Sequence, residues 1–206
     1  MFEFGDVRFR PMEEEDLKVF HEWENDFEVI MYSRNMPMNF PSMVQIQKRF
    51  EQWVSDEREL HFIIELIDSG EPIGIARLEK QDWSNVRTAE VGTYIGKKQF
   101  WGKGLGHQIT VALLEMSFNQ LNMERCEASS VEYNQRAHKV LEACGFRRSG
   151  VSRQSAFVNG RKWDRFHFDI LRDEYLEERM SLLKQILRNK LDTYIQKHCT
   201  IKDTSE

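Results

Sequence analysis

The stretch QFWGKGLGHQIT, residues 99–110, holds three glycines within five residues, at Gly102, Gly104 and Gly106. It lies between a segment with the pattern of a strand and a segment with the pattern of a helix. Glycine costs backbone entropy where a helix begins, but it lets another molecule approach the main chain closely. The first turn of a helix offers unpaired N–H groups and the positive end of the helix dipole. We therefore predict that this loop binds a phosphate group.

Two nucleotide-binding motifs resemble this loop without matching it. A Walker A loop needs Ser or Thr after its Gly-Lys pair, whereas Gly102 and Lys103 are followed by Gly104. A dinucleotide fingerprint needs glycine at the position of His107, and it normally follows the first strand of its unit. These departures disfavour a nucleotide site, while a glycine-rich turn without any ligand stays open on these residues alone.

The pattern on both sides of the loop predicts a sheet with two crossover helices. Pro11 opens a helix whose Leu17, Phe20 and Trp23 face inward, and residues 31–42, with two prolines and no period, predict a loop. Strands are expected near 7–10, 60–67, 73–81, 87–96, 125–133, 146–158 and 161–171, and further helices over 42–56, 103–121, 134–144 and 173–198. This order predicts a mixed α/β sheet.

The predicted C-terminal helix carries a single apolar stripe. Its members recur at spacings near three and four: Leu176, Met180, Leu183, Leu187, Leu191 and Tyr194. Such a stripe needs a partner surface. Either it packs back on the domain or it makes a homo-oligomer through self-association.

Composition bounds the class of protein. The chain has 206 residues, of which 40% are hydrophobic, enough for one core and a tail. Its net charge of −5 disfavours a nucleic-acid partner. The N-terminus lacks a signal-peptide pattern and no run approaches the roughly 18 apolar residues of a membrane span, so we expect a cytoplasmic protein without a membrane partner. Cys126, Cys144 and Cys199 show no paired spacing and the histidines are scattered, so neither a disulfide framework nor a metal site is expected.

A second motif, NQRAHKVLEACGF at residues 134–146, follows a strand expected beside the one before the loop. Together the loop and this motif resemble the GNAT superfamily of acetyl-CoA-dependent N-acetyltransferases. The opening VRFRPMEEEDL and the ending AFVNGRKWDRFHFDIL are similar to the subgroup of ribosomal-protein N-terminal and spermidine N-acetyltransferases. The resemblance implies a central, mostly antiparallel sheet with flanking helices and a long C-terminal helix. It implies a GNAT-like domain over 1–175 and a helical extension over 176–206.

The resemblance also implies which residues hold acetyl-CoA. The expected set is Tyr94, Ile95, Trp101, Gly102, Lys103, Gly104, Leu105, Gly106, Asn134 and Ala137. Trp101 stands where the family usually has Arg or Gln, which removes one phosphate contact. A main-chain N–H near Tyr94 or Ile95 is expected to face the thioester oxygen. Asn134 either contacts the pantetheine amide or simply caps its helix.

Glu90 is the candidate base that takes the proton of the amine, because several relatives carry a carboxylate on this strand. The alternative is a surface carboxylate paired with Arg87 or Arg77. Leu141 stands where many relatives have the tyrosine that protonates the departing thiolate. Tyr94, Tyr133 or a water is left for that step, or no acid is needed because a thiolate near a helix N-terminus is a tolerable leaving group. No general acid is assigned.

The acceptor is expected to be a primary amine, with a polyamine or a protein N-terminus favoured. The acidic residues of 13–26 either attract such a cation or form a solvated helix face. Tyr32, Phe40 and Trp163 are expected to line the acceptor end. An aminoglycoside or amino-acid acceptor, a non-catalytic acetyl-CoA sensor and a protein binding ATP or NAD are the alternatives.

Overall fold

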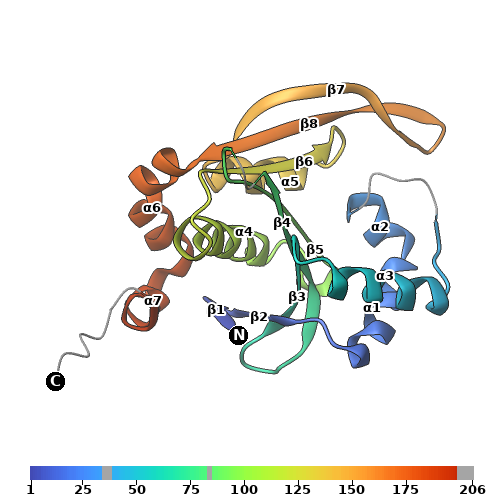
Figure 1. The fold of residues 1–206 in the computed structure, drawn as a ribbon, viewed down its shortest axis with the longest axis horizontal. Coiled ribbons are helices and arrows are strands. Elements are labelled where there is room, and N and C mark those ends of the chain that lie inside the picture. The colour runs from blue at the N-terminus through green and yellow to red at the C-terminus, as the bar shows by residue number, and fades with distance from the viewer. Residues whose placement is uncertain (34–38, 83–84, 199–206) are drawn as a thin grey trace.

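The computed structural model describes residues 1–33, 39–82 and 85–198. Its strands form one eight-stranded sheet in the order β1-β2-β3-β4-β5-β6-β8-β7 (Figure 1). The strands are β1 Phe2–Phe4, β2 Val7–Pro11, β3 Glu59–Leu66, β4 Pro72–Asp82, β5 Thr88–Ile95, β6 Arg125–Val131, β7 Arg147–Val158 and β8 Arg161–Leu171. Neighbours pair antiparallel except β5 and β6, which pair parallel. The predicted mixed, mostly antiparallel sheet is confirmed.

Helices cover both faces of the sheet. They are η1 Glu14–Asp16, α1 Leu17–Glu24, α2 Phe27–Ser33, α3 Met43–Ser55, η2 Lys98–Phe100, α4 Leu105–Glu115, the π-helical turn η3 Met116–Gln120, α5 Gln135–Ala143, α6 Arg172–Leu187, η4 Arg188–Lys190 and α7 Leu191–His198. Because side chains alternate along a strand, Ile64 of β3 packs against the cluster around α4 while Ile63 packs against α1 and α3. Figure 1 shows α4 and α1–α3 on opposite sides of β3–β5.

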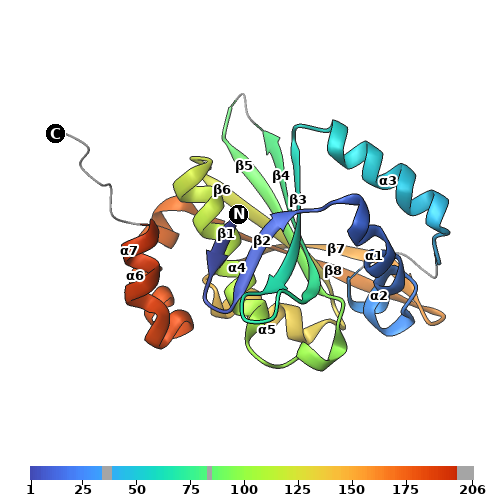
Figure 2. The same cartoon turned by 90° about the horizontal axis from the view of Figure 1, so that it is seen from below.

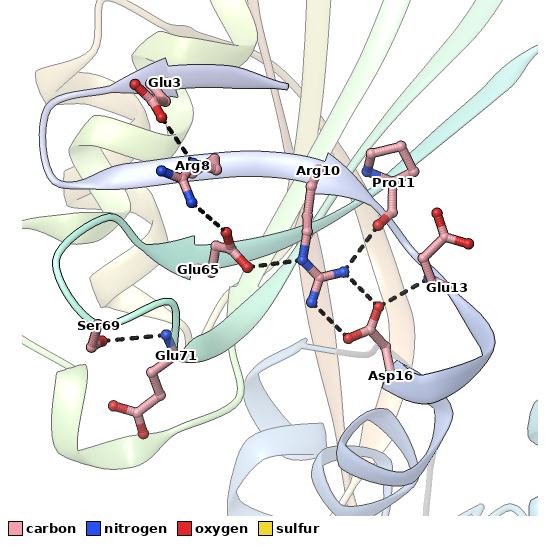
Figure 3. A network of polar contacts seen from close by, with 9 residues as sticks. All are labelled: Glu3, Arg8, Arg10, Pro11, Glu13, Asp16, Glu65, Ser69 and Glu71. Carbon is pink, nitrogen blue, oxygen red and sulfur yellow. Dashed lines mark hydrogen bonds and ion pairs between the residues drawn. The ribbon is translucent and has the colours of Figure 1, made fainter.

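The N-terminal strands are tied to η1 by a chain of charged contacts (Figure 3). Arg8 bridges Glu3 and Glu65, with both nitrogen–oxygen distances at 2.9 Å. Arg10 donates to Glu65 at 2.8 Å and to the two oxygens of Asp16 at 2.7 and 2.8 Å. Burial raises the pKa of Asp16, but the Arg10 guanidinium and the Glu13 N–H outweigh it and leave that pKa below its ordinary value. This network fixes where the chain leaves the sheet and enters α1.

Several predicted helix bounds need correction. The helix expected over 103–121 is α-helical only from Leu105 to Glu115, and a π-helical turn follows it. In the predicted loop 31–42, residues 31–33 instead end α2, and 34–38 lie outside the described residues. The helix capped by Ser42 is confirmed, since the Ser42 hydroxyl accepts from the N–H of Gln45.

The C-terminal helix is broken, contrary to the single helix predicted over 173–198. Arg188 has φ of 50°, which ends α6 and lets α7 turn back. Figures 1 and 2 show α6 and α7 at the end of the molecule away from α1–α3. Within the predicted stripe Leu183, Leu187 and Tyr194 are buried in the core, whereas Leu176 and Met180 are 44% and 43% exposed. The stripe therefore packs back on the domain for most of its length.

Glu115 of α4 anchors this C-terminal part. Arg179 of α6 donates two hydrogen bonds to its carboxylate, at 2.7 and 2.8 Å. The hydroxyls of Tyr175 and Tyr194 donate to the same carboxylate. Burial raises the pKa of Glu115, but these donors outweigh it and leave the pKa below its ordinary value of 4.5.

Of the helices in the described ranges, none has both the length and the apolar character needed to span a membrane.

Candidate active site

A cleft opens where β5 and β6 diverge. The two strands pair only from Thr88 to Glu90 against Arg125 to Glu127, after which β5 continues to Ile95 paired with β4 and β6 follows β8. The cleft has a volume of about 460 Å³ and is lined by residues 91–95 of β5, 128–130 of β6, and parts of α2, α4 and α5. Its walls include main chain at the edge of β5, so an elongated molecule can bind along a strand edge there.

The glycine loop forms one end of this cleft. Gly102 and Gly104 have φ of 73° and 81°, a conformation that side chains with a Cβ rarely adopt. Within the described part of the chain, no heavy atom lies within 4 Å of where a Cβ would stand on either residue. Gly104 is the N-cap of α4, so the N–H groups of the first turn face this open space. The loop therefore fits a phosphate group of acetyl-CoA.

Trp101 has a structural contact that explains its place in the loop. Its indole N–H donates to the carbonyl of Ile95 at 2.7 Å, which ties the loop to the end of β5. The guanidinium of Arg136 lies 5.5 Å from the Trp101 ring centroid and 5.8 Å from that of Tyr32. Arg136 and Lys139 both line the cleft and supply the positive charge that Trp101 lacks. Sequence reasoning missed both, although Arg136 and Lys139 lie inside the second motif.

Asn134 caps α5 as predicted. Its side-chain oxygen accepts from the N–H of Ala137 at 3.2 Å, and its amide donates to the carbonyl of Tyr32 at 3.0 Å. Asn134 and Ala137 line the cleft, as do Tyr94, Ile95, Trp101, Gly102, Gly104 and Gly106. Leu105 is buried in the core instead, and Lys103 lines a neighbouring cavity. A contact between Asn134 and the pantetheine amide stays a prediction.

Tyr94 contacts a buried carboxylate that sequence reasoning placed on a helix surface. The Tyr94 hydroxyl donates to Glu24 at 2.8 Å, and Arg49 of α3 donates to the other oxygen of Glu24 at 2.7 Å. Glu24 is 1% exposed. It therefore neither belongs to a solvated helix face nor lies at the surface where it could attract a cationic acceptor. The contact holds α1 and α3 against β5 beside the cleft.

Glu90 lies on the face of β5 opposite α4, two residues from Gly92 of the cleft wall. Its carboxylate accepts from Arg77 at 3.0 Å and from Gln81 at 2.8 Å. The ion pair with Arg77, one of the two expected alternatives, is therefore present, whereas Arg87 pairs with Glu124. A role for Glu90 as base stays a prediction.

The three residues expected at the acceptor end are placed differently. Tyr32 lines the cleft, and its ring centroid lies 6.1 Å from that of Tyr133. Trp163 continues this row, with its centroid 5.1 Å from that of Tyr133. Phe40 is 49% exposed and does not line the cleft.

The structure also places three residues that bear on the general acid and on a covalent nucleophile. Leu141 lines it where relatives have tyrosine, and the Tyr133 hydroxyl donates to the carbonyl of Met31 at 2.6 Å. Burial raises the pKa of Cys144 to about 12, so its thiol is not a nucleophile near neutral pH. In the described residues no cluster of His, Cys, Asp and Glu is arranged to hold a metal ion.

Relatives of known class share this architecture. Residues 6–147 match the GNAT acetyltransferase domain family. The chain is 30% identical over 170 residues to the uncharacterized N-acetyltransferase p20 of Bacillus licheniformis, which covers 82% of this chain and 94% of that protein. It is 26% identical over 172 residues to spermidine N(1)-acetyltransferase of Escherichia coli K12, and these residues make up 84% of this chain and 89% of that protein.

A solved structure agrees with these matches. Spermidine N-acetyltransferase of Vibrio cholerae, in complex with CoA and spermine, has a TM-score of 0.75 at 25% identity and covers 83% of this chain and 98% of its own. The diverging strands, the open glycine loop and the domain match lead to one assignment. The chain belongs to the GNAT superfamily of N-acetyltransferases, enzymes that move an acetyl group from acetyl-CoA to an amine.

Proposed function

We propose that this enzyme acetylates a polyamine by direct transfer. The observation that carries the proposal is a row of carboxylates across the sheet, on the face that holds Glu90. Register pairs Glu59 with Glu79, Glu79 with Glu90, Glu90 with Glu127, and Glu127 with Asp169. We call these five residues the acidic row.

Two guanidinium groups contact all five carboxylates of the acidic row. Arg77 contacts Glu79 at 2.5 Å, Glu90 at 3.0 Å and Glu59 at 3.9 Å, and Arg125 contacts Asp169 at 2.5 Å and Glu127 at 2.6 Å. Like charges directly opposite each other on neighbouring strands destabilise a sheet. Strands lie about 4.8 Å apart, a spacing on the scale of the short methylene links between polyamine nitrogens. A polyamine lying along the row would relieve this repulsion and bring an amine to Glu90.

The relatives support the same acceptor. The proteins of Escherichia coli and Vibrio cholerae are spermidine acetyltransferases by name, and the latter was solved with spermine. A protein N-terminus offers one cationic nitrogen, whereas a polyamine offers several, which a row of carboxylates can bind together. We therefore favour a polyamine over a peptide.

Residues of this chain bind acetyl-CoA and take up the proton of the amine in this transfer. Acetyl-CoA supplies the thioester carbonyl that the amine attacks. The glycine loop binds phosphate through main-chain N–H groups, and β5 offers a main-chain N–H near Tyr94 or Ile95 to the carbonyl oxygen. Glu90 accepts the proton from the amine, which becomes nucleophilic. Solvent water protonates the thiolate, because Leu141 has no proton to give.

The test measures CoA release with spermidine, spermine, aminoglycosides, amino acids and short peptides as acceptors. We expect turnover with the two polyamines and little with peptides. Turnover confined to peptides or aminoglycosides would contradict the acceptor and leave the family assignment standing. No turnover together with tight acetyl-CoA binding would favour a non-catalytic sensor.

A matched pair of variants separates the base from the acidic row. Glu90→Gln is expected to lower kcat by about a hundredfold, within the usual contribution of a general base, while the Kd of acetyl-CoA stays unchanged. Glu79→Gln removes the same charge one strand away and is expected to raise KM for spermidine with kcat nearly unchanged. Equal kcat values for the two variants would contradict the role of Glu90.

Three further properties stay proposals. We propose a cytoplasmic location and a domain boundary near residue 175, although α6 runs across that position. Leu176 and Met180 are the exposed part of the apolar stripe and would carry any self-association.

A further inference from the structure

A second cavity lies on the other side of the glycine loop. It has a volume of about 420 Å³ and three walls. The walls are Gly5 and Asp6 of the β1–β2 turn, Lys103, Gly104, His107 and Gln108 of the loop and α4, and residues 185–190 at the end of α6. Gly104 and His107 line both this cavity and the cleft, so the two spaces meet at the glycine loop.

One of these walls is not supplied by the family domain. The domain match ends at residue 147, whereas residues 185–190 belong to the last helices of the chain. These residues are held in place from two sides. Glu115 fixes α6 and α7 to α4, and Lys190 contacts Asp6 of the β1–β2 turn. The cavity is therefore a feature of this chain rather than of the matched domain alone.

The charge left in the cavity is positive. Asp6 is the carboxylate of its lining, and it is already bound by the amide of Gln108 at 2.7 Å and by the ammonium of Lys190. These contacts hold the pKa of Asp6 below its ordinary value, through the Gln108 hydrogen bond first and Lys190 second. Lys103 and Arg188 are exposed, and within the described residues neither forms an ion pair with a carboxylate. Two cations thus border the open side of the glycine loop.

Arg188 holds an unusual backbone position at this wall. Its φ of 50° and ψ of −116° lie outside the regions that residues with a Cβ favour. Glycine adopts such a conformation without strain, so an arginine here destabilises the chain relative to glycine. Strain of this kind is often retained where a side chain has a function.

We infer that the C-terminal helices complete a second phosphate site, in which Lys103 and Arg188 bind a terminal phosphate group beside the glycine loop. The ligand comes from one of two sources. One is the 3′-phosphate of the CoA that the enzyme already uses, whose pyrophosphate the loop suits. The other is a separate phosphorylated molecule such as ADP. The inference concerns the cofactor end of the reaction and is independent of the polyamine acceptor.

The first experiment compares CoA with dephospho-CoA, which lacks only the 3′-phosphate. Calorimetry gives the ratio of the two Kd values for the wild type, for Arg188→Gly and for Lys184→Ala. Lys184 is an exposed cation on α6 outside the cavity, and its variant removes the same charge. We expect the wild type and Lys184→Ala to prefer CoA by about tenfold, because a charge-assisted hydrogen bond has this magnitude. Arg188→Gly should lower this ratio clearly, and Arg188→Gly combined with Lys103→Ala should bring it close to one.

Stability distinguishes loss of the side chain from damage to the fold. Since glycine relieves the backbone strain, Arg188→Gly is expected to unfold in urea at a midpoint no lower than that of the wild type. A lowered midpoint together with a weakened affinity for both ligands would assign Arg188 a structural role and overturn the inference.

The second experiment identifies the source of the phosphate. ADP is titrated into protein saturated with CoA, and the melting temperature is followed. A separate phosphate ligand gives a further rise in melting temperature that Arg188→Gly abolishes, with equal affinities for CoA and dephospho-CoA. If the wild type binds CoA and dephospho-CoA equally and ADP adds nothing, the cavity is not a phosphate site.

Discussion

Glu115 is the residue on which the attachment of the C-terminal helices depends most. Glu115 is 2% exposed, and its carboxylate accepts five hydrogen bonds, two from Arg179 and one each from Tyr175, Tyr194 and Asn119. Glu115→Gln keeps the shape of the side chain but removes the charge. Removing one partner of a buried ion pair costs about 3–5 kcal/mol, because the other charge stays buried without compensation. The glutamine oxygen still accepts one hydrogen bond, so we expect a loss of about 3 kcal/mol.

Urea unfolding at pH 7 measures this loss. The matched control is Glu124→Gln, because Glu124 forms an exposed ion pair with Arg87 and its side chain is 44% exposed. Exposed pairs contribute about 0–1 kcal/mol, so the control should hardly change the unfolding midpoint. A loss below about 1 kcal/mol for Glu115→Gln, equal to the control, would refute the anchoring role.

The same group predicts a dependence on pH. The folded pKa of Glu115 lies below its ordinary value of 4.5, so the folded state favours the ionised form. Its contribution to stability is complete above pH 4.5 and is lost as the pH falls through the folded pKa. The wild type should therefore lose stability more steeply below pH 4.5 than Glu115→Gln does. Parallel acid-unfolding curves for the two proteins would contradict the direction of the shift.

Three other changes test the cleft and its support. Gly104→Ala forces a residue with a Cβ to φ of 81° and fills the open side of the loop, so acetyl-CoA should bind at least about tenfold more weakly in calorimetry; unchanged affinity would argue against a phosphate there. Trp101→Phe removes the hydrogen bond to Ile95 and should lower stability to urea by about 1 kcal/mol; an unaltered midpoint would show that this bond does not hold the loop. Asp16→Asn weakens the contact with Arg10 and should cost about 1–3 kcal/mol in the same assay, and a neutral result would contradict its role.

Local sequence patterns predicted those parts of the site that depend on neighbouring residues. The glycines of the loop, the Ser42 cap and the Asn134 cap each depend on residues within a few positions, and all three adopt the predicted local structure. The parallel pairing of β5 and β6 followed from the helix that connects them.

Contacts between distant residues were beyond such patterns. In the sequence Glu24 is one of several acidic residues of a predicted helix face. In the structure it is buried and contacts Arg49 and Tyr94, which come from distant parts of the chain. The break in the C-terminal helix lies at an arginine, which gives no signal of a positive φ. The second cavity needs the β1–β2 turn, the glycine loop and residue 188 together, and these are far apart in sequence.

Mass spectrometry of spermidine, after incubation with acetyl-CoA and the purified protein, tests whether the cleft delivers an acetyl group to a polyamine. We expect monoacetylated spermidine on a terminal nitrogen, with an equal amount of free CoA, and a sharply reduced yield from Glu90→Gln. Unmodified spermidine beside protein that binds acetyl-CoA, or an equal yield from Glu90→Gln, would contradict it.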